Sequence, residues 1–324
     1  MKRAVSVLLS AALMLSVLTG CGKSGSVSKK NIPAEETAAS KKIALSDSGI
    51  TVDGAAISDD ETAAVYAAQD IVYYEEGQGV AYGAGTDADA HSQEEADAHT
   101  VVHITQPGTY TLSGTLSAGQ IAVDLGDGAE EDPEAVVTIV LDGVDITCTV
   151  APAIIFYRVY ECGSADMETA TQTVDTSAAG ANVVIADGTE NRVTGSHVAK
   201  IYKPESVTLN ADGTAVEETK KLHKYDGALY SKMSMNVSGG EAGTGTLEIV
   251  ADNEGLDSEL HLTINSGNIH ILAGNDGINT NEDGVSVTTI NGGTLDLTCN
   301  GNGNTALDAE GTYTNNGGDV TTND

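Results

Sequence analysis

The sequence predicts an all-β solenoid, that is, a stack of β-strand coils with surface loops inserted between some of them. Two observations predict this fold: a short turn unit that recurs in the last quarter of the chain, and alternation of apolar and polar residues between its copies. A fixed turn with short alternating strands, repeated at a period of about 20 to 50 residues, is typical of solenoids. The repeat is too short for pairs of helices, so it favours coils of β-strands.

The turn unit begins with Asn in its regular copies and has an apolar residue at its fourth position. Its copies are Asn253–Asp257, Asn275–Asn279 and Asn304–Asp308, with a degenerate earlier copy at Asp226–Tyr230. The apolar anchors lie 27, 22 and 29 residues apart, at Leu229, Leu256, Ile278 and Leu307. A second repeat lies between them, with Asn first and Gly third, at 265–269, 291–295 and 316–320.

The strands between these turns alternate with a period of two, so that one set of side chains points inward. Leu295, Leu297 and Cys299 form such a set, and Leu262 and Ile264 form another. Because stacked strands lie about 4.8 Å apart, equivalent residues of successive coils should form columns. One expected column holds Asp226, Asn253, Asn275 and Asn304. The other holds Tyr230, Asp257, Asn279 and Asp308.

These columns suggest a bound cation. Asn side chains in a column can hydrogen-bond to one another as a ladder, but stacked carboxylates repel unless a positive charge lies between them. No Lys or Arg follows Lys232. A hard cation is the natural neutraliser, and Ca²⁺ binds about 6 to 8 oxygen ligands. The alternative is that each Asx-Gly pair only forms a turn.

The first residues predict export and a lipid anchor. Lys2 and Arg3 precede an apolar run, 4–18, that is too short for a permanent membrane span. Leu18-Thr19-Gly20-Cys21 resembles a bacterial lipoprotein cleavage box, with an ordinary signal peptide as the alternative. We therefore expect a signal peptide at 1–20, a lipidated flexible tether at 21–42 and a β domain at 43–324, held on the outer side of the cell membrane.

Within the domain we expect strands at 101–104, 108–112, 120–125, 136–146 and 182–186. Three stretches read as surface insertions: 58–79 with helical character, the acidic 83–99, and the Ser/Thr-rich 163–181. The chain ends at Asn323-Asp324, which resembles the start of another turn. Because a solenoid needs a polar cap, we expect further coils beyond this point.

The composition of the chain limits the classes of partner that the protein can bind. With 15 Lys and Arg against 48 Asp and Glu, the formal charge of −33 excludes nucleic acid as a partner. The charge also disfavours an acidic polymer as a partner unless cations bridge the polymer and the protein. The alternative is that the charge serves plain solubility or adaptation to salt. Cys148 and Cys162 could pair in an oxidising compartment, whereas Cys299 reads as a core residue. We read His91, His99 and His103 as incidental, with a transition-metal site as the alternative.

Several segments together resemble one family. They are Gly108–Gly114 followed by Gly119–Ile121, Val140–Thr147, Ile185–Asn191, Gly227–Lys232 and the turn Asn275–Ile278. In this order they are similar to the clostridial carbohydrate-binding β-helix family of surface proteins, which are related in fold to pectate lyases. The resemblance covers the chain from about residue 44 to the end, apart from the insertions.

The resemblance implies a right-handed parallel β-helix, bound Ca²⁺, and affinity for cellulose and acidic, pectin-like polysaccharides. It implies ligands among the Asx turns, at Asp252, Asn275, Asp276 and Asn279. Asp257 and Asp308 join them from the column argument alone. Two departures matter: 304–306 lacks the Asp-Gly of the family turn, which weakens a ligand at that coil, and the insertion 163–181 can change the binding face.

The function expected from these features is a non-catalytic, monomeric surface lipoprotein that binds polysaccharide, with Ca²⁺ bridging protein and uronate carboxylates. The first alternative is a Ca²⁺-dependent polysaccharide lyase, whose best placed base is Lys232. The regular coils beyond Lys232 carry no Lys or Arg, which counts against catalysis. The second alternative is a structural adhesin or spacer.

Overall fold

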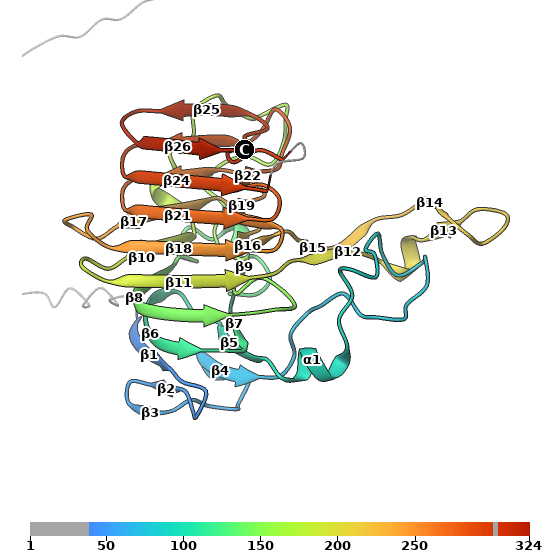
Figure 1. The fold of residues 1–324 in the computed structure, drawn as a ribbon, viewed down its shortest axis with the longest axis horizontal. Coiled ribbons are helices and arrows are strands. Elements are labelled where there is room, and N and C mark those ends of the chain that lie inside the picture. Colours follow the sequence, from blue (N-terminus) through green and yellow to red (C-terminus); the bar gives the residue numbers. More distant parts are fainter. Residues whose placement is uncertain (1–38, 301–303) are drawn as a thin grey trace, which may run out of the picture. The chain divides into compact units, whose positions relative to one another are not determined.

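Short β-strands, stacked coil upon coil, make up most of the structure (Figure 1). The computed structural model describes residues 39–300 and 304–324. The expected signal peptide, the lipidated Cys21 and the tether up to residue 38 lie outside the described residues. No helix in the described part of the chain is long and apolar enough to cross a membrane.

Each coil of the C-terminal half supplies strands to three parallel rows. The first row holds β17 (Met235–Gly239), β20 (Leu262–Ile264), β23 (Val287–Ile290) and β25 (Thr312–Asn315). The second holds β18 (Thr246–Ala251), β21 (Asn268–Ala273), β24 (Thr294–Cys299) and β26 (Asp319–Asn323). The third holds β16 (Gly227–Ser231), β19 (Glu254–Ser258) and β22 (Ile278–Thr280). The chain visits the rows in turn, as the 22-to-29-residue repeat predicts.

The N-terminal half continues the same rows. β1 (Ala39–Leu45) pairs in parallel with β6 (Gly108–Leu116), and β6 pairs with β8 (Val137–Thr147). These long strands turn a corner, with a positive φ at Gly114 and a register shift there. The next coil divides the path between β10 (Ala181–Ile185) and β11 (Glu190–Gly195). The third row continues through β5 (Thr100–Ile104), β7 (Gly119–Asp124) and β9 (Ile154–Arg158). The predicted strands of this half are therefore confirmed.

The core lies between the rows of strands and is filled by the inward apolar residues. Leu295, Leu297 and Cys299 are buried, and so are Leu262 and Ile264, which confirms the alternation. The apolar anchors of the turn unit stack in register, Leu229 on Leu256 and Leu256 on Ile278. Complete burial of each such side chain contributes about 1.5 to 3 kcal/mol.

Segments outside the rows differ from expectation in two places. Stretch 58–79 has no helix; it forms turns and β4 (Val65–Ala68), which is antiparallel to β5. An arm of residues 198–225, not anticipated from the sequence, projects from the coils (Figure 1). Its elements are β12 (Val198–Tyr202), η3 (Pro204–Ser206), β13 (Thr208–Leu209), β14 (Val216–Glu218) and β15 (Lys221–Tyr225), paired antiparallel.

The remaining short elements lie at the first coil and in the loops. They are β2 (Thr51–Val52), β3 (Ala55–Ala56), α1 (Gln93–Asp97) in the acidic insertion, η1 (Ala129–Glu131), and η2 (Thr176–Ala178) in the insertion 163–181. Ser92 caps α1 by accepting a hydrogen bond from the Glu95 backbone N–H. These insertions are therefore ordered loops on the outside of the coils.

The cysteines and histidines have separate surroundings. Cys148, Cys162 and Cys299 are free thiols, so the pairing of the first two is not found. His103 Nε2 lies 2.8 Å from Asp70 and its ring stacks on Tyr66. The other two histidines contact Glu95, His91 through the carboxylate and His99 through the backbone carbonyl. In the described residues these three histidines form no metal cluster.

Candidate metal centre

Both predicted columns exist. Strand pairing stacks Tyr230 on Asp257 and Asp257 on Asn279, and a bridge between Ile278 and Leu307 continues this register toward Asp308. In the other column, the Asn253 side chain donates to the Asp226 carbonyl, and the Asn275 backbone N–H donates to the Asn253 carbonyl. Successive coils therefore repeat the turn at the same place on the stack.

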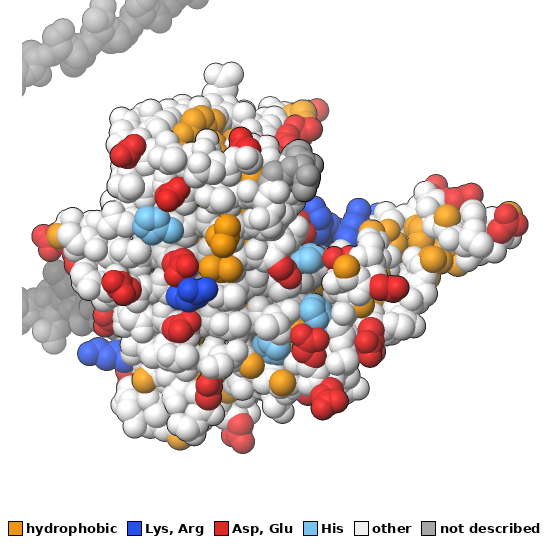
Figure 2. Space-filling view, viewed as in Figure 1, with side chains coloured by type: hydrophobic (Ala, Val, Ile, Leu, Met, Phe, Trp, Pro, Cys, Tyr) orange, Lys and Arg blue, Asp and Glu red, His pale blue; other side chains and the backbone are white. Residues whose placement is uncertain are grey.

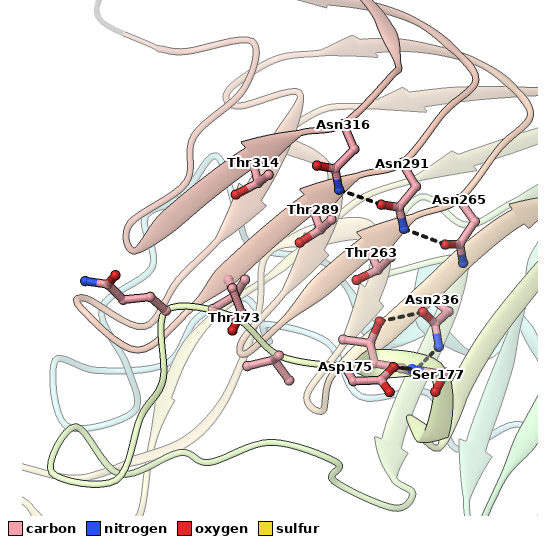
Figure 3. Close-up of a pocket in the computed structure, with 14 residues that line it drawn as sticks. Thr173, Asp175, Ser177, Asn236, Thr263, Asn265, Thr289, Asn291, Thr314 and Asn316 are labelled. Carbon is pink, nitrogen blue, oxygen red and sulfur yellow. Dashed lines mark hydrogen bonds between the residues drawn. The ribbon is translucent and has the colours of Figure 1, made fainter.

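The predicted ladder of Asn side chains does not form in the Asp226–Asn304 column, because its amides donate to backbone carbonyls. It forms instead in the second repeat. Asn316 Nδ2 donates to Asn291 Oδ1 at 2.8 Å, and Asn291 Nδ2 donates to Asn265 Oδ1 at 2.9 Å (Figure 3). These three residues follow the first-row strands directly, where exposed turns leave the side chains free to meet.

Three carboxylates converge in the third row. Asp226 precedes β16, and Glu254 and Asp257 lie on β19; one oxygen of each lies within 4.8 Å of the others. Their exposed fractions are 7%, 5% and 0%. Gly227 pairs with Glu254, and a Cβ there would lie 2.6 Å from the Cβ of Asp257. The glycine therefore leaves the room that this acidic cluster occupies.

The acidic cluster contains polar atoms without partners. Glu254 Oε2, Asp257 Oδ2 and Asn279 Oδ1 are buried and accept no hydrogen bond from any described residue. The other oxygen of Asp257 accepts from Asn281 Nδ2 at 2.6 Å. A buried carboxylate oxygen without a partner is costly. The three atoms without a partner are two carboxylate oxygens and one amide oxygen, the types of ligand atom that hard cations prefer.

The charge balance of the acidic cluster also favours a bound cation. Burial and then the charge of Asp226 raise the pKa of Glu254 to about 7. Burial and then the charge of Glu254 raise the pKa of Asp257 well above its usual range. Lys224 Nζ lies 2.7 Å from Asp226 Oδ2, which supplies one positive charge. One lysine does not balance three carboxylates, so these residues fit a divalent cation, and the acidic cluster could hold a metal ion.

The other sequence-predicted ligands lie elsewhere. Asp252 accepts from Ser196 Oγ at 2.6 Å and pairs with His197 at 3.3 Å. Asp276 accepts from the Thr305 backbone N–H at 2.7 Å. The carboxylates of these two residues and of Asp308 are not part of the acidic cluster, and the Asn275 backbone N–H donates to the Asn253 carbonyl in the other column. Of the predicted ligands, Asp257 belongs to the acidic cluster, and Asn279 pairs in register with it.

Sequence reasoning did not name Asp226 and Glu254 as ligands. Asp226 was assigned to a column only, and Glu254 stands at the second position of its turn, where the other copies have Gly, Asp and Thr. One feature of the sequence could have identified Glu254: the residue opposite it in the preceding coil is Gly227. A glycine in one coil leaves space for a large side chain in the next.

A basic pocket adjoins the acidic cluster. Its volume is about 230 Å³, and Lys224 lines it together with Lys232, the base named for the lyase alternative. Its other lining residues include Arg158, Lys221, Tyr157, Tyr225 and Tyr230. Figure 2 shows Lys and Arg side chains gathered where the arm leaves the coils. The arm thus concentrates positive charge on a strongly acidic protein.

Most cations of this basic pocket are already paired. Arg158 donates to both oxygens of Asp124, at 2.6 and 2.7 Å, and Lys221 pairs with Glu259 at 3.1 Å. Lys232 forms no ion pair with a described residue. Burial raises the pKa of Tyr225 and Tyr230, two phenols that are protonated at neutral pH in any case. Lys232 is therefore the cation most available to an anionic ligand.

The chain is similar to one family model and to two known proteins. A family model described as carbohydrate-binding domain-containing protein matches residues 98–324. A curated protein of that description from Acetivibrio thermocellus is 31% identical over 173 residues, 53% of this chain and 45% of that protein. The chain thus spans about half the length of that relative. A solved polysaccharide lyase-like protein from C. thermocellum, a gadolinium derivative, aligns with 88% of this chain and 94% of that chain, at 21% identity and a TM-score of 0.44.

Proposed function

Because the chain belongs to the carbohydrate-binding domain-containing protein family, we propose that it is a non-catalytic polysaccharide-binding module whose acidic cluster holds Ca²⁺. The family match carries this proposal, since it spans 98–324 and so includes the acidic cluster and nearly all of the coils. The coils then form a right-handed parallel β-helix. Parallel in-register rows support this, and connections between parallel strands are right-handed in the great majority of proteins.

The ion is structural in this proposal. The sequence suggested that Ca²⁺ would bridge protein and uronate carboxylates, but Asp226, Glu254 and Asp257 are buried, so an ion among them is out of reach of a polymer. Such an ion would satisfy the orphan oxygens of Glu254 and Asp257 and hold two successive coils together. It would therefore support binding by stabilising the fold.

The basic pocket offers a contact for acidic polysaccharides that needs no bridging ion. Lys232 is unpaired among the described residues. The hydroxyl of Tyr230 already donates to Glu259 and that of Tyr225 is hydrogen-bonded to His223, so the Tyr157 hydroxyl is the phenol of this pocket that can donate to a sugar. A uronate carboxylate meeting Lys232 would make a charge-assisted hydrogen bond. The same observation favours the second candidate function, a lyase in which Lys232 is the base.

Co-sedimentation of the chain tests the proposal. The chain is mixed with insoluble polygalacturonate or cellulose, with Ca²⁺ or with EDTA, and the soluble fraction is assayed for unsaturated sugar ends. Pelleting without product supports a binding module. Unsaturated ends that disappear in Lys232→Gln would make the protein a lyase, and no pelleting with either polymer leaves the structural spacer.

Two features remain predictions from the N-terminal residues: the location on the outer side of the cell membrane, and the lipid on Cys21. Under this proposal, the tether carries the module away from the membrane surface so that it can reach polysaccharide. Cys21→Ala tests the anchor: the variant should move from the membrane fraction to the soluble exported fraction. Unchanged partition into membranes would refute the lipid anchor and leave the binding proposal intact.

A further inference from the structure

A polar groove runs along the first row of strands, on a part of the surface that shares no residue with the acidic cluster or the basic pocket (Figure 3). Its volume is about 370 Å³. Strands β20, β23 and β25 and the turns after them form its floor and one wall, and residues 172–177 of the insertion form the other wall. The groove therefore crosses several coils in the direction of the stack.

The floor presents one hydroxyl from each coil. Thr263 pairs in register with Thr289, and Thr289 pairs with Thr314. None of the three hydroxyls is hydrogen-bonded to another described side chain or backbone group. Each hydroxyl can therefore both donate to and accept from a ligand. The repeat of the coils places the same polar group at the same point three times.

The wall of the groove is the Asn ladder. Asn265, Asn291 and Asn316 each use one amide N–H, on Ser238, Asn265 and Asn291 respectively. An amide has two N–H donors, so a second N–H of each residue stays available. These side chains are exposed and line the groove in the same order as the threonines. Mutual hydrogen bonds hold them in one orientation, which reduces the entropy lost when a ligand binds.

The opposite wall is held in place by a buried contact. Asn236 is 6% exposed, its Oδ1 accepts from Thr176 Oγ1 at 2.7 Å, and its amide donates to the Thr176 carbonyl. This contact fastens the insertion to β17, the first-row strand before β20, and closes that end of the groove. Asp175 is the one charged residue in the lining, and its carboxylate accepts from the Ser177 backbone N–H.

The chemistry of the groove selects the ligand. Amides and hydroxyls dominate the lining, with no cation to attract a carboxylate and one carboxylate to repel it. The coils repeat at about 4.8 Å, close to the length of one sugar in an extended β-linked chain. We propose that this groove binds a neutral, extended polysaccharide along the stack, one sugar per coil. The inference rests on the proposed function and assigns it a site.

Removal of the hydroxyl row tests the groove. The full chain with Thr263→Val, Thr289→Val and Thr314→Val keeps the shape and strand preference of these residues while deleting three polar groups. The matched control is Thr138→Val, in the same column farther down the stack and outside the groove. Cellulose is the neutral probe and polygalacturonate the acidic one. The single variant Thr289→Val is measured as well, so that the groove can still be tested if the triple variant misfolds.

We expect the triple variant to bind cellulose at least tenfold more weakly, which is about 1.4 kcal/mol, while Thr138→Val binds as the wild type does. Unchanged cellulose binding by folded variants would overturn the groove and leave the proposed function standing. Wild-type protein that binds polygalacturonate but not cellulose would also overturn the groove, because an acidic polymer is the ligand proposed for the basic pocket. Binding to neither polymer would refute the proposed function itself.

Discussion

Replacing Glu254 by glutamine should stabilise the metal-free protein at pH 8. The pKa of this carboxyl is raised from 4.5 to about 7, by burial first and by the charge of Asp226 second. The folded state therefore binds more protons than the unfolded state between these two pH values. Stability falls as pH rises through this window, and the loss is complete above the folded-state pKa. Glutamine does not titrate, so the variant escapes the loss.

The size of the effect follows from the shift. A rise from 4.5 to about 7 is about 2.5 units, and at about 1.36 kcal/mol per unit the metal-free wild type loses about 3 kcal/mol by pH 8. For a domain of this size, that loss corresponds to about 6 °C in melting temperature. Saturating Ca²⁺ opposes it, because an ion present at about 100 times its Kd adds about 2.7 kcal/mol.

The assay is thermal unfolding followed by circular dichroism, at pH 5 and pH 8, in EDTA and in excess Ca²⁺. Burial lowers the pKa of His197, but Asp252 and Asp89 raise it more, and the net rise also lowers stability with increasing pH. The informative quantity is therefore the difference between wild type and Glu254→Gln. Glu248→Gln, an exposed carboxylate paired with Arg192, is the control and should change stability by less than about 1 kcal/mol.

We expect Glu254→Gln to melt above the wild type in EDTA at pH 8, to match it at pH 5, and to respond less to Ca²⁺. Two results would refute the reasoning. The first is a variant less stable than the wild type in EDTA at pH 8, which would mean that the carboxylate is well accommodated without metal. The second is a wild-type melting temperature that is the same in EDTA and in Ca²⁺ at pH 8.

Three further predictions concern packing, the ladder and the thiols. Gly274→Ala should cost about 1 to 3 kcal/mol in urea unfolding, because its Cβ would lie 1.9 Å from the Asp252 carbonyl oxygen; Gly79→Ala, which meets nothing within 4 Å, should be near neutral, and equal costs would contradict this packing. Asn291→Ala removes both ladder hydrogen bonds and should cost about 1 kcal/mol in the same assay; no loss would mean that the ladder adds no stability. Burial raises the pKa of Cys162 to about 11 and that of Cys148 to about 12, so iodoacetamide at pH 8 should modify them only after denaturation, and rapid labelling of the folded protein would exclude this environment.

The regular part of the fold follows directly from the sequence. In a parallel stack, a repeat along the chain becomes a column in space, so the spacing of Leu229, Leu256 and Ile278 was sufficient to predict which residues would meet. Alternation identified Leu295 and Leu297 as core residues for the same reason, since side chains of a strand point alternately to its two faces.

The sequence predicted three inserted loops without their form, and it did not predict the arm 198–225. The arm 198–225 has no repeat and no long alternating run, and its strands pair with each other and, through Ile201, with Gly83 of the acidic insertion. The loop before Ala181 takes its position from the contact of Thr176 with Asn236, two residues 60 positions apart. Local pattern carries no record of such a contact, so the groove was not predictable from the sequence.

The sequence by itself determined the class of fold, the register of the coils and the existence of polar columns on them, because all three depend on periodicity along the chain. Only the tertiary structure decided which polar residues matter. Asp226, Glu254 and Asp257 became a candidate metal centre through burial, while Asp252 and Asp276 found other partners. The physical reason is that the cost of a carboxylate depends on what covers it, and the covering residues come from other coils and from the arm.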